Sequence, residues 1–303
     1  MAETKKNKKL VYTVLTNNYE SPAKIVKDDG WDYICMTDSD TLKSNQWDVR
    51  KIPNWVMELP ANKRQRIIKI LPHIFFPEYE ISLYIDANVN IVSKGHLDSY
   101  LERYLKNNVV AIPKHPQRDC AYKEFLVVRK SKKDTSNAAV FQCERYLDEG
   151  MPAKYGLWET NIMFRKHNHP DCIKLMTKWA LELMMGSHRD QLSISYSTYR
   201  TGVKICSMPS TTRNDRVFKC NMRHAKPKAT DKKKVPVKTT VSKKQTVPKK
   251  QPTTPKKQIT SAPKKQKQPE KKVKVDSVVK LHERKKTRKY SSTNHKIMQF
   301  VSE

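Results

Sequence analysis

Residues 81–91, Ile-Ser-Leu-Tyr-Ile-Asp-Ala-Asn-Val-Asn-Ile, limit the fold more than any other stretch of the chain. A run of apolar, β-branched and aromatic side chains is typical of a strand buried on both faces, as in parallel sheets covered by helices. Asp86 and Asn88 interrupt this run. Residues two apart on an extended chain point the same way, so each could offer an oxygen to one hard cation or sugar hydroxyl. In the alternative interpretation, Asp-Ala-Asn only forms a turn at the end of the strand.

Strands and helices alternate along the first 225 residues. β-Branched and aromatic runs predict further strands at residues 10–15, 32–37, 109–113 and 203–206. Apolar residues at helical spacing predict helices at residues 62–71, 96–107, 140–147 and 172–185. This alternation favours an α/β fold with a mixed, mainly parallel sheet and helices on both faces. No Gly-x-Gly-x-x-Gly or P-loop pattern occurs, which argues against a dinucleotide-binding fold and a P-loop ATPase.

The composition changes near residue 226. Residues 226–303 contain 25 Lys and Arg but 5 Asp and Glu, and they repeat a Pro-Lys-Lys-Gln block three times. Such a segment cannot bury enough apolar surface to offset the entropy of ordering. We therefore expect a basic N-terminal extension at residues 1–9, a folded domain at residues 10–225 and a disordered, basic C-terminal tail at residues 226–303. The tail would bind nucleic acid or other polyanions nonspecifically and in a salt-sensitive way.

The six cysteines are scattered and form no Cys-x-x-Cys pair, and the first residues lack the apolar segment of a signal peptide. We expect reduced cysteines. No apolar run approaches the roughly 20 residues of a membrane helix. The expectation is a soluble, cytoplasmic or otherwise intracellular protein with no membrane span.

A short basic helix is expected just before the strand that ends at Asp86. Asn62 would cap it and Pro72 would stop it. Arg66, Lys69 and His73 are three and four residues apart, so they should gather on one face of that helix. This face is either solvated or directs Lys69 and His73 toward phosphates.

Two other polar segments follow predicted strands. Thr16 and Asn17 follow the strand at residues 10–15, and open α/β sheets bind ligands at the carboxyl ends of their strands. They are either nucleotide contacts or part of an ordinary polar turn. His115 and Arg118 lie on a loop that leaves the strand at residues 109–113, and such loops often carry anion-binding or proton-transfer groups.

The later part of the domain adds two pairs of polar residues. Glu159 and Asn161 lie on one side of an extended run, and polar groups that face a core need partners such as a substrate. Asp190 and Gln191 lie near the start of a helix, where an acidic side chain is often only a cap.

In chain order, the motifs resemble a glycosyltransferase-like family, long known as a domain of unknown function and related to the family 8 nucleotide-sugar transferases of GT-A fold. The resemblance spans about residues 10–224. It rests on the basic helix, Ile-Asp-Ala-Asn at 85–88, His-Pro-x-Arg-x-Cys-x-Tyr-x-Glu at 115–124, Glu-x-Asn at 159–161 and Arg-Asp-Gln-Leu-Ser at 189–193. It implies a GT-A-like (Rossmann-like) fold and metal-dependent transfer of a hexosyl or pentosyl group. The donor would be a nucleotide-sugar, commonly UDP-linked, and the acceptor a hydroxyl of a glycan, protein or small molecule.

The resemblance also implies roles for individual residues. Mn²⁺ or Mg²⁺ would bridge the diphosphate, with Asp86 in the first acidic position of the metal-binding Asp-x-Asp pattern. Asn88 departs from the second position, because it offers an oxygen without charge, and His224 is the candidate for a third ligand. The remaining candidates are divided between a phosphate and donor cradle (Thr16, Asn17, Lys69, His73, His115, Arg118, Asn161 and Gln191) and two carboxylates that act as base, stabiliser or orienting group (Glu159 and Asp190). Kinship to family 8 suggests retention of anomeric configuration.

Two other functions are compatible with the sequence. One is a nucleic-acid-binding protein whose globular part is an inactive transferase-like domain and whose basic tail binds the polyanion. The other is a metal-dependent nuclease, although the acidic residues are not spaced as a two-metal set. A transferase without an anchor would suit a large virus that encodes its own glycosylation machinery.

Overall fold

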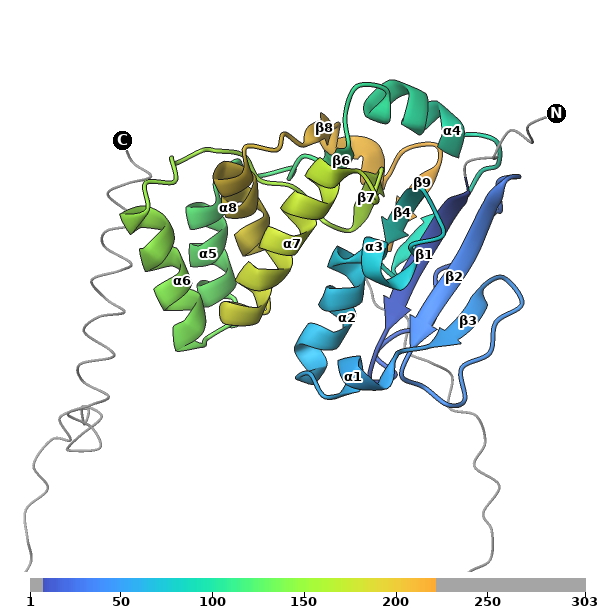
Figure 1. Cartoon of the computed structure of the whole chain (residues 1–303), viewed down its shortest axis with the longest axis horizontal. Coiled ribbons are helices and arrows are strands. Elements are labelled where there is room, and N and C mark those ends of the chain that lie inside the picture. The colour runs from blue at the N-terminus through green and yellow to red at the C-terminus, as the bar shows by residue number, and fades with distance from the viewer. Residues whose placement is uncertain (1–7, 222–303) are drawn as a thin grey trace, which may run out of the picture. The chain divides into compact units, whose positions relative to one another are not determined.

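The computed structural model describes residues 8–221, and these residues form a seven-stranded sheet in the order β3-β2-β1-β4-β7-β6-β8 (Figure 1). The strands are β1 (Lys9–Leu15), β2 (Trp31–Thr37), β3 (Asp48–Lys51), β4 (Ile81–Ile85), β6 (Val110–Pro113), β7 (Ile162–Arg165) and β8 (Cys206–Met208). Strand β7 is antiparallel to its neighbours β4 and β6, and the other neighbours pair in parallel. The predicted fold class, a mixed and mainly parallel α/β sheet, is confirmed.

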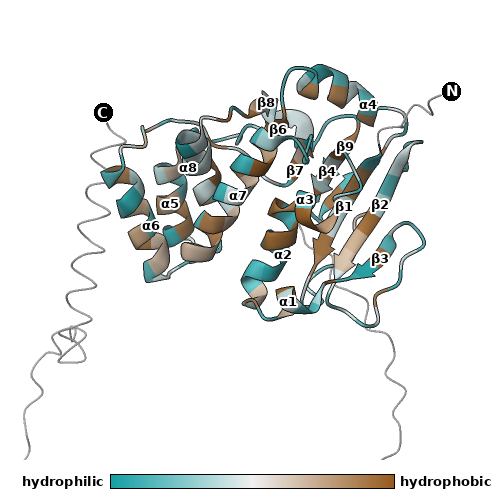
Figure 2. Cartoon of the chain, viewed as in Figure 1, coloured by the Kyte–Doolittle hydropathy of each residue, from teal (hydrophilic) through white to brown (hydrophobic). Residues whose placement is uncertain are grey.

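The sheet separates two buried clusters because successive side chains of a strand point to opposite faces. In β1, Leu10, Tyr12 and Val14 belong to one cluster, whereas Val11 and Leu15 belong to the other. Figure 2 shows hydrophobic residues concentrated along the central strands. A strand that is apolar on both faces therefore needs cover on both sides, as its sequence predicts.

Helices provide that cover. The first face packs against α2 (Ala61–Ile70) and α7 (Pro170–Met185). The second face packs against α4 (Leu97–Tyr100), its π-helical continuation η1 (Leu101–Leu105) and a small antiparallel sheet of β5 (Val89–Ile91) and β9 (Phe218–Cys220). A third cluster joins α5 (Ala121–Lys130), α6 (Asn137–Asp148) and α8 (Gln191–Thr201), which lie side by side in Figure 1. The remaining short elements are α1 (Asn54–Met57), α3 (Pro72–Phe75) and η2 (Ser210–Arg213).

The chain order creates a switch point between β1 and β4. From β1 the sheet grows outward through β2 and β3, and the chain then returns to place β4 on the opposite side of β1. Loops that leave the carboxyl ends of two such strands diverge and leave a crevice, where ligands of open α/β sheets bind. Thr16 directly follows β1, and Asp86 directly follows β4.

Several predicted boundaries need correction. Helix α2 begins at Ala61 after Pro60, so Asn62 lies within its first turn and is not the N-cap; the predicted stop before Pro72 is correct. The loop at 114–124 is shorter than predicted because α5 begins at Ala121. The last strand of the main sheet is β8 rather than residues 203–206.

Strand β3 was not predicted at all. Its sequence, Asp-Val-Arg-Lys, is hydrophilic in Figure 2 and carries no apolar alternation. It lies at the edge of the sheet and pairs with β2 alone. Edge strands tolerate charged side chains, which also protect the edge from pairing with other chains, so hydrophobic patterning does not detect them.

All six cysteines are free, as predicted. Among the described residues, no helix is long and apolar enough to span a bilayer. Residues 1–7 of the predicted basic extension and the whole predicted tail at residues 226–303 lie outside the described residues.

Candidate functional site

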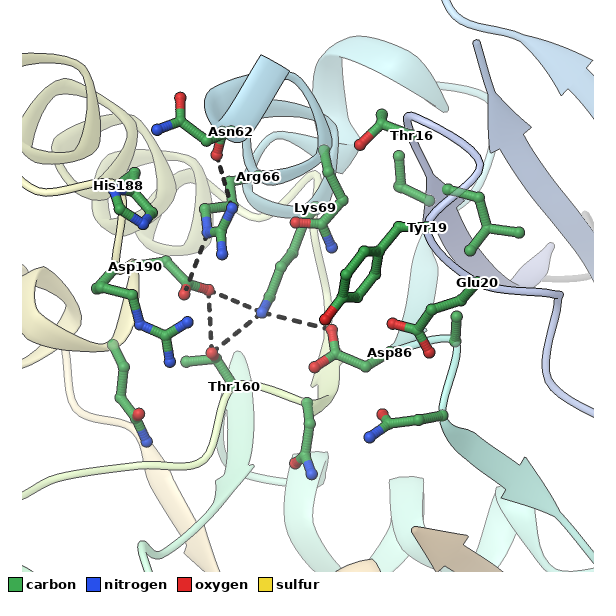
Figure 3. Close-up of a pocket in the computed structure, with 18 of the residues that line it drawn as sticks. Thr16, Tyr19, Glu20, Asn62, Arg66, Lys69, Asp86, Thr160, His188 and Asp190 are labelled. Carbon is green, nitrogen blue, oxygen red and sulfur yellow. Dashed lines mark hydrogen bonds and ion pairs between the residues drawn. The ribbon is translucent and has the colours of Figure 1, made fainter. Parts of the chain in front are cut away.

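A cavity of about 680 Å³ opens at the switch point (Figure 3). Its volume lies within the range of about 300–1,000 Å³ that is usual for small-molecule sites. Its walls come from the loop after β1, helix α2, the turn between β4 and β5, and the segments before β7 and α8. Nine predicted site residues line it: Thr16, Asn17, Lys69, Asp86, Asn88, Glu159, Asn161, Asp190 and Gln191. Residues from five distant segments therefore meet in one place.

The centre of the cavity is the Lys69 ammonium group. Lys69 Nζ lies 2.7 Å from Asp190 Oδ2 and 3.7 Å from Asp86 Oδ1, and it donates a hydrogen bond of 3.1 Å to Thr160 Oγ1. Thr160 in turn donates to Asp190 Oδ2 at 3.0 Å. The side chains of Lys69 and Asp190 are 4% and 8% exposed. This lysine is thus already paired with protein carboxylates, and it is not a free phosphate ligand.

Asp190 is not a helix cap, although it occupies the residue before α8. Its side chain makes no capping hydrogen bond. Burial opposes ionisation of this carboxyl, but the charges of Lys69 and Arg66 outweigh that effect and hold its pKa well below the usual value of an aspartate. Asp190 therefore stays ionised and is a poor proton acceptor.

Asp86 and Asn88 lie on a turn. The Val89 amide donates to the Asp86 carbonyl at 2.9 Å, so the turn interpretation of Asp-Ala-Asn describes the backbone. Both side chains nevertheless line the cavity. Asp86 Oδ1 accepts a hydrogen bond of 2.7 Å from the Tyr84 hydroxyl, and Asn88 Nδ2 donates to the Asn221 carbonyl at 3.0 Å.

Asp86 and Asn88 are the predicted metal donors in this cavity, and the carboxylate of Glu20 lies on the same side of Lys69 as Asp86 (Figure 3). Among residues 8–221 there is no cluster of three His, Cys, Asp or Glu that could enclose a metal. A Mg²⁺ ion, however, usually binds through one or two carboxylates together with substrate phosphates and water. One carboxylate and one carboxamide oxygen at the cavity wall fit a cation that is shared with a bound diphosphate. His224, the candidate third ligand, lies outside the described residues.

Glu159 and Asn161 present unpaired acceptors. Arg213 Nη1 donates to Glu159 Oε1 at 2.8 Å, but Glu159 Oε2 and Asn161 Oδ1 are buried without a hydrogen-bond partner. Burial raises the pKa of Glu159 despite the opposing charge of Arg213. Buried acceptors without partners are costly, so a ligand that donates hydrogen bonds would satisfy them.

Three predicted residues do not line the cavity. His73 lies on α3, where burial and the charge of Arg165 lower its pKa. Arg118 Nε pairs with the buried Glu124 at 2.5 Å, and its Nη2 lies 3.0 Å from His115 Nε2. Burial and nearby arginines lower the pKa of His115 to about 4, so it is neutral at physiological pH. His115 and Arg118 brace the loop beside Glu159 rather than forming a phosphate cradle.

The cavity also has charged lining residues that the sequence did not assign to it. They are Arg66, Lys133, His188, Arg189 and Glu20. Arg66 was on the predicted basic face, three residues before Lys69, and His188 and Arg189 directly precede Asp190. Neither Lys133 nor Arg213 carries a local sequence signal, because both reach the site only through tertiary packing.

One protein family and several solved structures are similar to this chain. The model of the family "TOD1/MUCI70, glycosyltransferase-like domain" matches residues 35–224. Among solved structures, apo mouse xyloside xylosyltransferase 1 aligns with a TM-score of 0.39 and 8% identity, over 67% of this chain and 84% of that one. The apo WbbM bifunctional glycosyltransferase aligns with a TM-score of 0.40 and 12% identity, over 67% of this chain and 39% of that one. No curated protein matches the sequence.

Proposed function

Because the chain belongs to the TOD1/MUCI70 glycosyltransferase-like family, we propose that it transfers a sugar from a nucleotide diphosphate donor to an acceptor hydroxyl. The proposed donor is UDP-linked, and the proposed acceptor is a glycan, a protein or a small molecule. Lining residues from β1, α2 and the β4–β5 turn would hold the donor at the switch point, where open α/β sheets bind nucleotides.

One observation carries the proposal. Glu159 Oε2 and Asn161 Oδ1 are buried acceptors without partners, and both residues line the cavity that also contains Asp86. A sugar offers several hydroxyl donors, so it can satisfy both acceptors at once. The Asp86 end would then lie against the diphosphate of the same donor.

In the proposed reaction, the bond between the anomeric carbon and the diphosphate oxygen breaks, and its electron pair leaves with the diphosphate. The acceptor oxygen bonds to the anomeric carbon, and its proton passes to the departing diphosphate, with retention of configuration. Asp86 and Asn88 would hold Mn²⁺ or Mg²⁺, which when bound neutralises the charge of the leaving group. Glu159 would stabilise the positive charge that develops on the sugar.

Asp190 has a different role. Since its carboxylate is ion-paired with Lys69 at 2.7 Å, we assign it to positioning. The pair holds the ammonium group near Asp86, where it adds positive charge beside the proposed diphosphate site. Lys69 thus contributes to the electrostatics of the site from a fixed, buried position.

The test uses the full chain. Titration with UDP, with and without Mn²⁺, should show binding that strengthens with the metal, and a panel of UDP-sugars should include one that releases UDP. The proposal is lost if no nucleotide diphosphate binds or shifts the melting temperature, with or without Mn²⁺, and no UDP-sugar is hydrolysed or transferred.

A further inference from the structure

The cavity has two chemically different ends, and Lys69 lies between them. In Figure 3, Glu20 and Asp86 lie on one side of Lys69, and His188 and Asp190 lie on the other. Lys69 Nζ connects the two sides, at 3.7 Å from Asp86 Oδ1 and 2.7 Å from Asp190 Oδ2. The Asp86 end follows the carboxyl end of β4 and is the donor end in the proposed function.

The second end carries an excess of positive charge. Its cationic side chains are Arg66, Lys133 and Arg189, whereas burial lowers the pKa of the neighbouring His188 and favours its neutral form. The two carboxylates beside them already have partners. Asp190 pairs with Lys69, and buried Asp134 accepts hydrogen bonds from the Ser187 hydroxyl at 2.5 Å and the Ser136 amide at 2.8 Å, with His188 Nδ1 at 3.3 Å.

Arg189 is a partly buried cation without a close partner, although its charge acts on Asp190 from beyond ion-pair distance. The exposed Lys133 side chain likewise forms no hydrogen bond or ion pair within the described residues. Within residues 8–221 the guanidinium group of Arg189 forms no hydrogen bond or ion pair, and its Nε is buried and unpaired. Its backbone is fixed, because its amide donates to Ser187 Oγ at 3.0 Å. Arg66 differs, since its Nη1 donates to the Asn62 carbonyl at 2.6 Å and its Nε lies 3.7 Å from Asp190 Oδ1.

A guanidinium group on a fixed backbone is suited to one class of ligand. Its planar array of N–H donors matches a carboxylate or a phosphate with two parallel hydrogen bonds. Leaving a buried donor unpaired costs free energy that such an anion would recover. The unpaired arginine therefore points to an anionic ligand at this end of the cavity.

We propose that Arg189, with Lys133 on the same cavity wall, binds a carboxylate or phosphate group carried by the acceptor. The proposal rests on the proposed function, because that function places the donor diphosphate at the Asp86 end. The buried Lys69–Asp190 pair lies between the two ends, so the diphosphate and the acceptor anion occupy separate sites. The acceptor is then an acidic or phosphorylated sugar, free or within a glycan.

Donor-free binding tests the proposal directly. Glucuronate, glucose 6-phosphate and glucose would be titrated into the full chain and followed by calorimetry or ligand-observed NMR. We expect the two anionic sugars to bind about tenfold or more tightly than glucose, as a charge-assisted hydrogen-bonded pair implies. Arg189→Gln should abolish this preference, and Arg189→Lys, which keeps the charge but loses the planar array, should retain part of it.

Two further titrations separate the possible outcomes. Lys130→Gln, on the exposed end of α5 outside the cavity, removes one charge and should bind all three sugars like the wild type. Arg189→Gln should change UDP affinity by less than about twofold, because the diphosphate lies at the other end of the cavity. A UDP affinity that falls as far as the glucuronate affinity would mean that Arg189 holds the diphosphate, and it would overturn the proposal.

Equal binding of glucose and glucuronate by the wild type would also overturn the proposal. A wild-type chain that binds no UDP would contradict the proposed function instead. The sugar titrations need no donor, so they test whether Arg189 binds an anion whether or not the chain binds UDP. Melting curves for both Arg189 variants would verify folding, and Arg189→Lys provides the comparison if Arg189→Gln does not fold.

Discussion

Lys69 and Asp190 form a buried ion pair that joins the last turn of α2 to the start of α8, with 2.7 Å between Nζ and Oδ2. Removing one partner of a buried pair leaves an uncompensated charge, which is far more costly than losing a surface pair. The pair thus contributes both to stability and to the shape of the cavity.

Asp190→Asn should lower the free energy of unfolding by about 3–5 kcal/mol, because it leaves the Lys69 ammonium group buried without its carboxylate. Urea denaturation followed by circular dichroism measures this change. The matched control is Asp29→Asn, which removes the exposed partner of Lys94 and should cost less than about 1 kcal/mol. Equal costs for the two variants would contradict the assignment of a buried pair.

The same pair predicts a pH dependence. The native pKa of Asp190 is depressed, chiefly because Lys69 and Arg66 outweigh the effect of burial, so its stabilisation is present above the unfolded pKa of about 3.9 and is lost as pH falls. Below that value, the stability difference between wild type and Asp190→Asn should narrow by about 1.4 kcal/mol per pH unit. Urea titrations of both proteins between pH 3 and pH 7 provide the measurement. If the stability difference between wild type and Asp190→Asn stayed constant over this range, Asp190 would be excluded as the source of the pH dependence.

The sequence predicts the parts of this site that depend on strand ends. Asp86 follows the buried strand β4, and Glu159 precedes the buried strand β7. Both side chains therefore lie at the same edge of the sheet, whatever the sequence between the two strands. Asp190 was found through its motif, but its role was not, because a cap and an ion pair look identical in sequence. The structure distinguishes the two roles, because the Asp190 side chain makes no capping hydrogen bond and instead pairs with Lys69 of α2.

The remaining assignments depended on geometry that local patterns do not contain. His73 shares a helical face with Lys69 only if one helix continues, but α2 ends at Ile70 and a new short helix begins at Pro72. Arg118 was expected to bind phosphate, but Glu124, six residues later, is its partner. Arg189 stands out only after the partners of every neighbouring charge are known.

Asn88→Asp should strengthen Mn²⁺ binding in the presence of UDP, because it restores a second negative charge to the turn after β4. Asp86→Ala should remove the dependence of UDP binding on Mn²⁺. Calorimetric titration of UDP with and without the metal measures both effects. Asp29→Asn again serves as the control, since it removes a carboxylate that does not line the cavity. Unchanged metal dependence in Asp86→Ala would remove this residue from the metal site.

His115 should destabilise the protein in mild acid. Its native pKa is lowered to about 4 by burial and by Arg118 and Arg213, whereas an unfolded histidine titrates near 6.5. The unfolded state therefore binds more protons between these values, and stability falls as pH drops from 6.5 toward 4. His115→Gln should reduce this slope in urea titrations, and a remainder should persist because the pKa of buried His167 is also lowered to about 4. An unchanged slope in His115→Gln would mean that His115 titrates normally in the folded protein.

Glu159→Gln tests the proposed chemistry most directly. Loss of one charged group that stabilises the transition state should lower kcat for sugar transfer by about 10²–10³-fold. UDP affinity should change little, because the glutamine keeps the shape of the side chain and the diphosphate lies at the Asp86 end. Glu102→Gln, on the exposed surface of η1, provides the control for loss of a carboxylate.

The pH profile distinguishes this role from a purely structural one. Burial raises the pKa of Glu159 above the usual value of a glutamate, and only the ionised form can stabilise positive charge on the sugar. Wild-type kcat should therefore rise with pH through that raised pKa, and this acid limb should be absent in Glu159→Gln. A variant that keeps both the wild-type rate and the acid limb would show that the carboxylate does not act on the reacting sugar, and the unpaired Oε2 would then need another explanation.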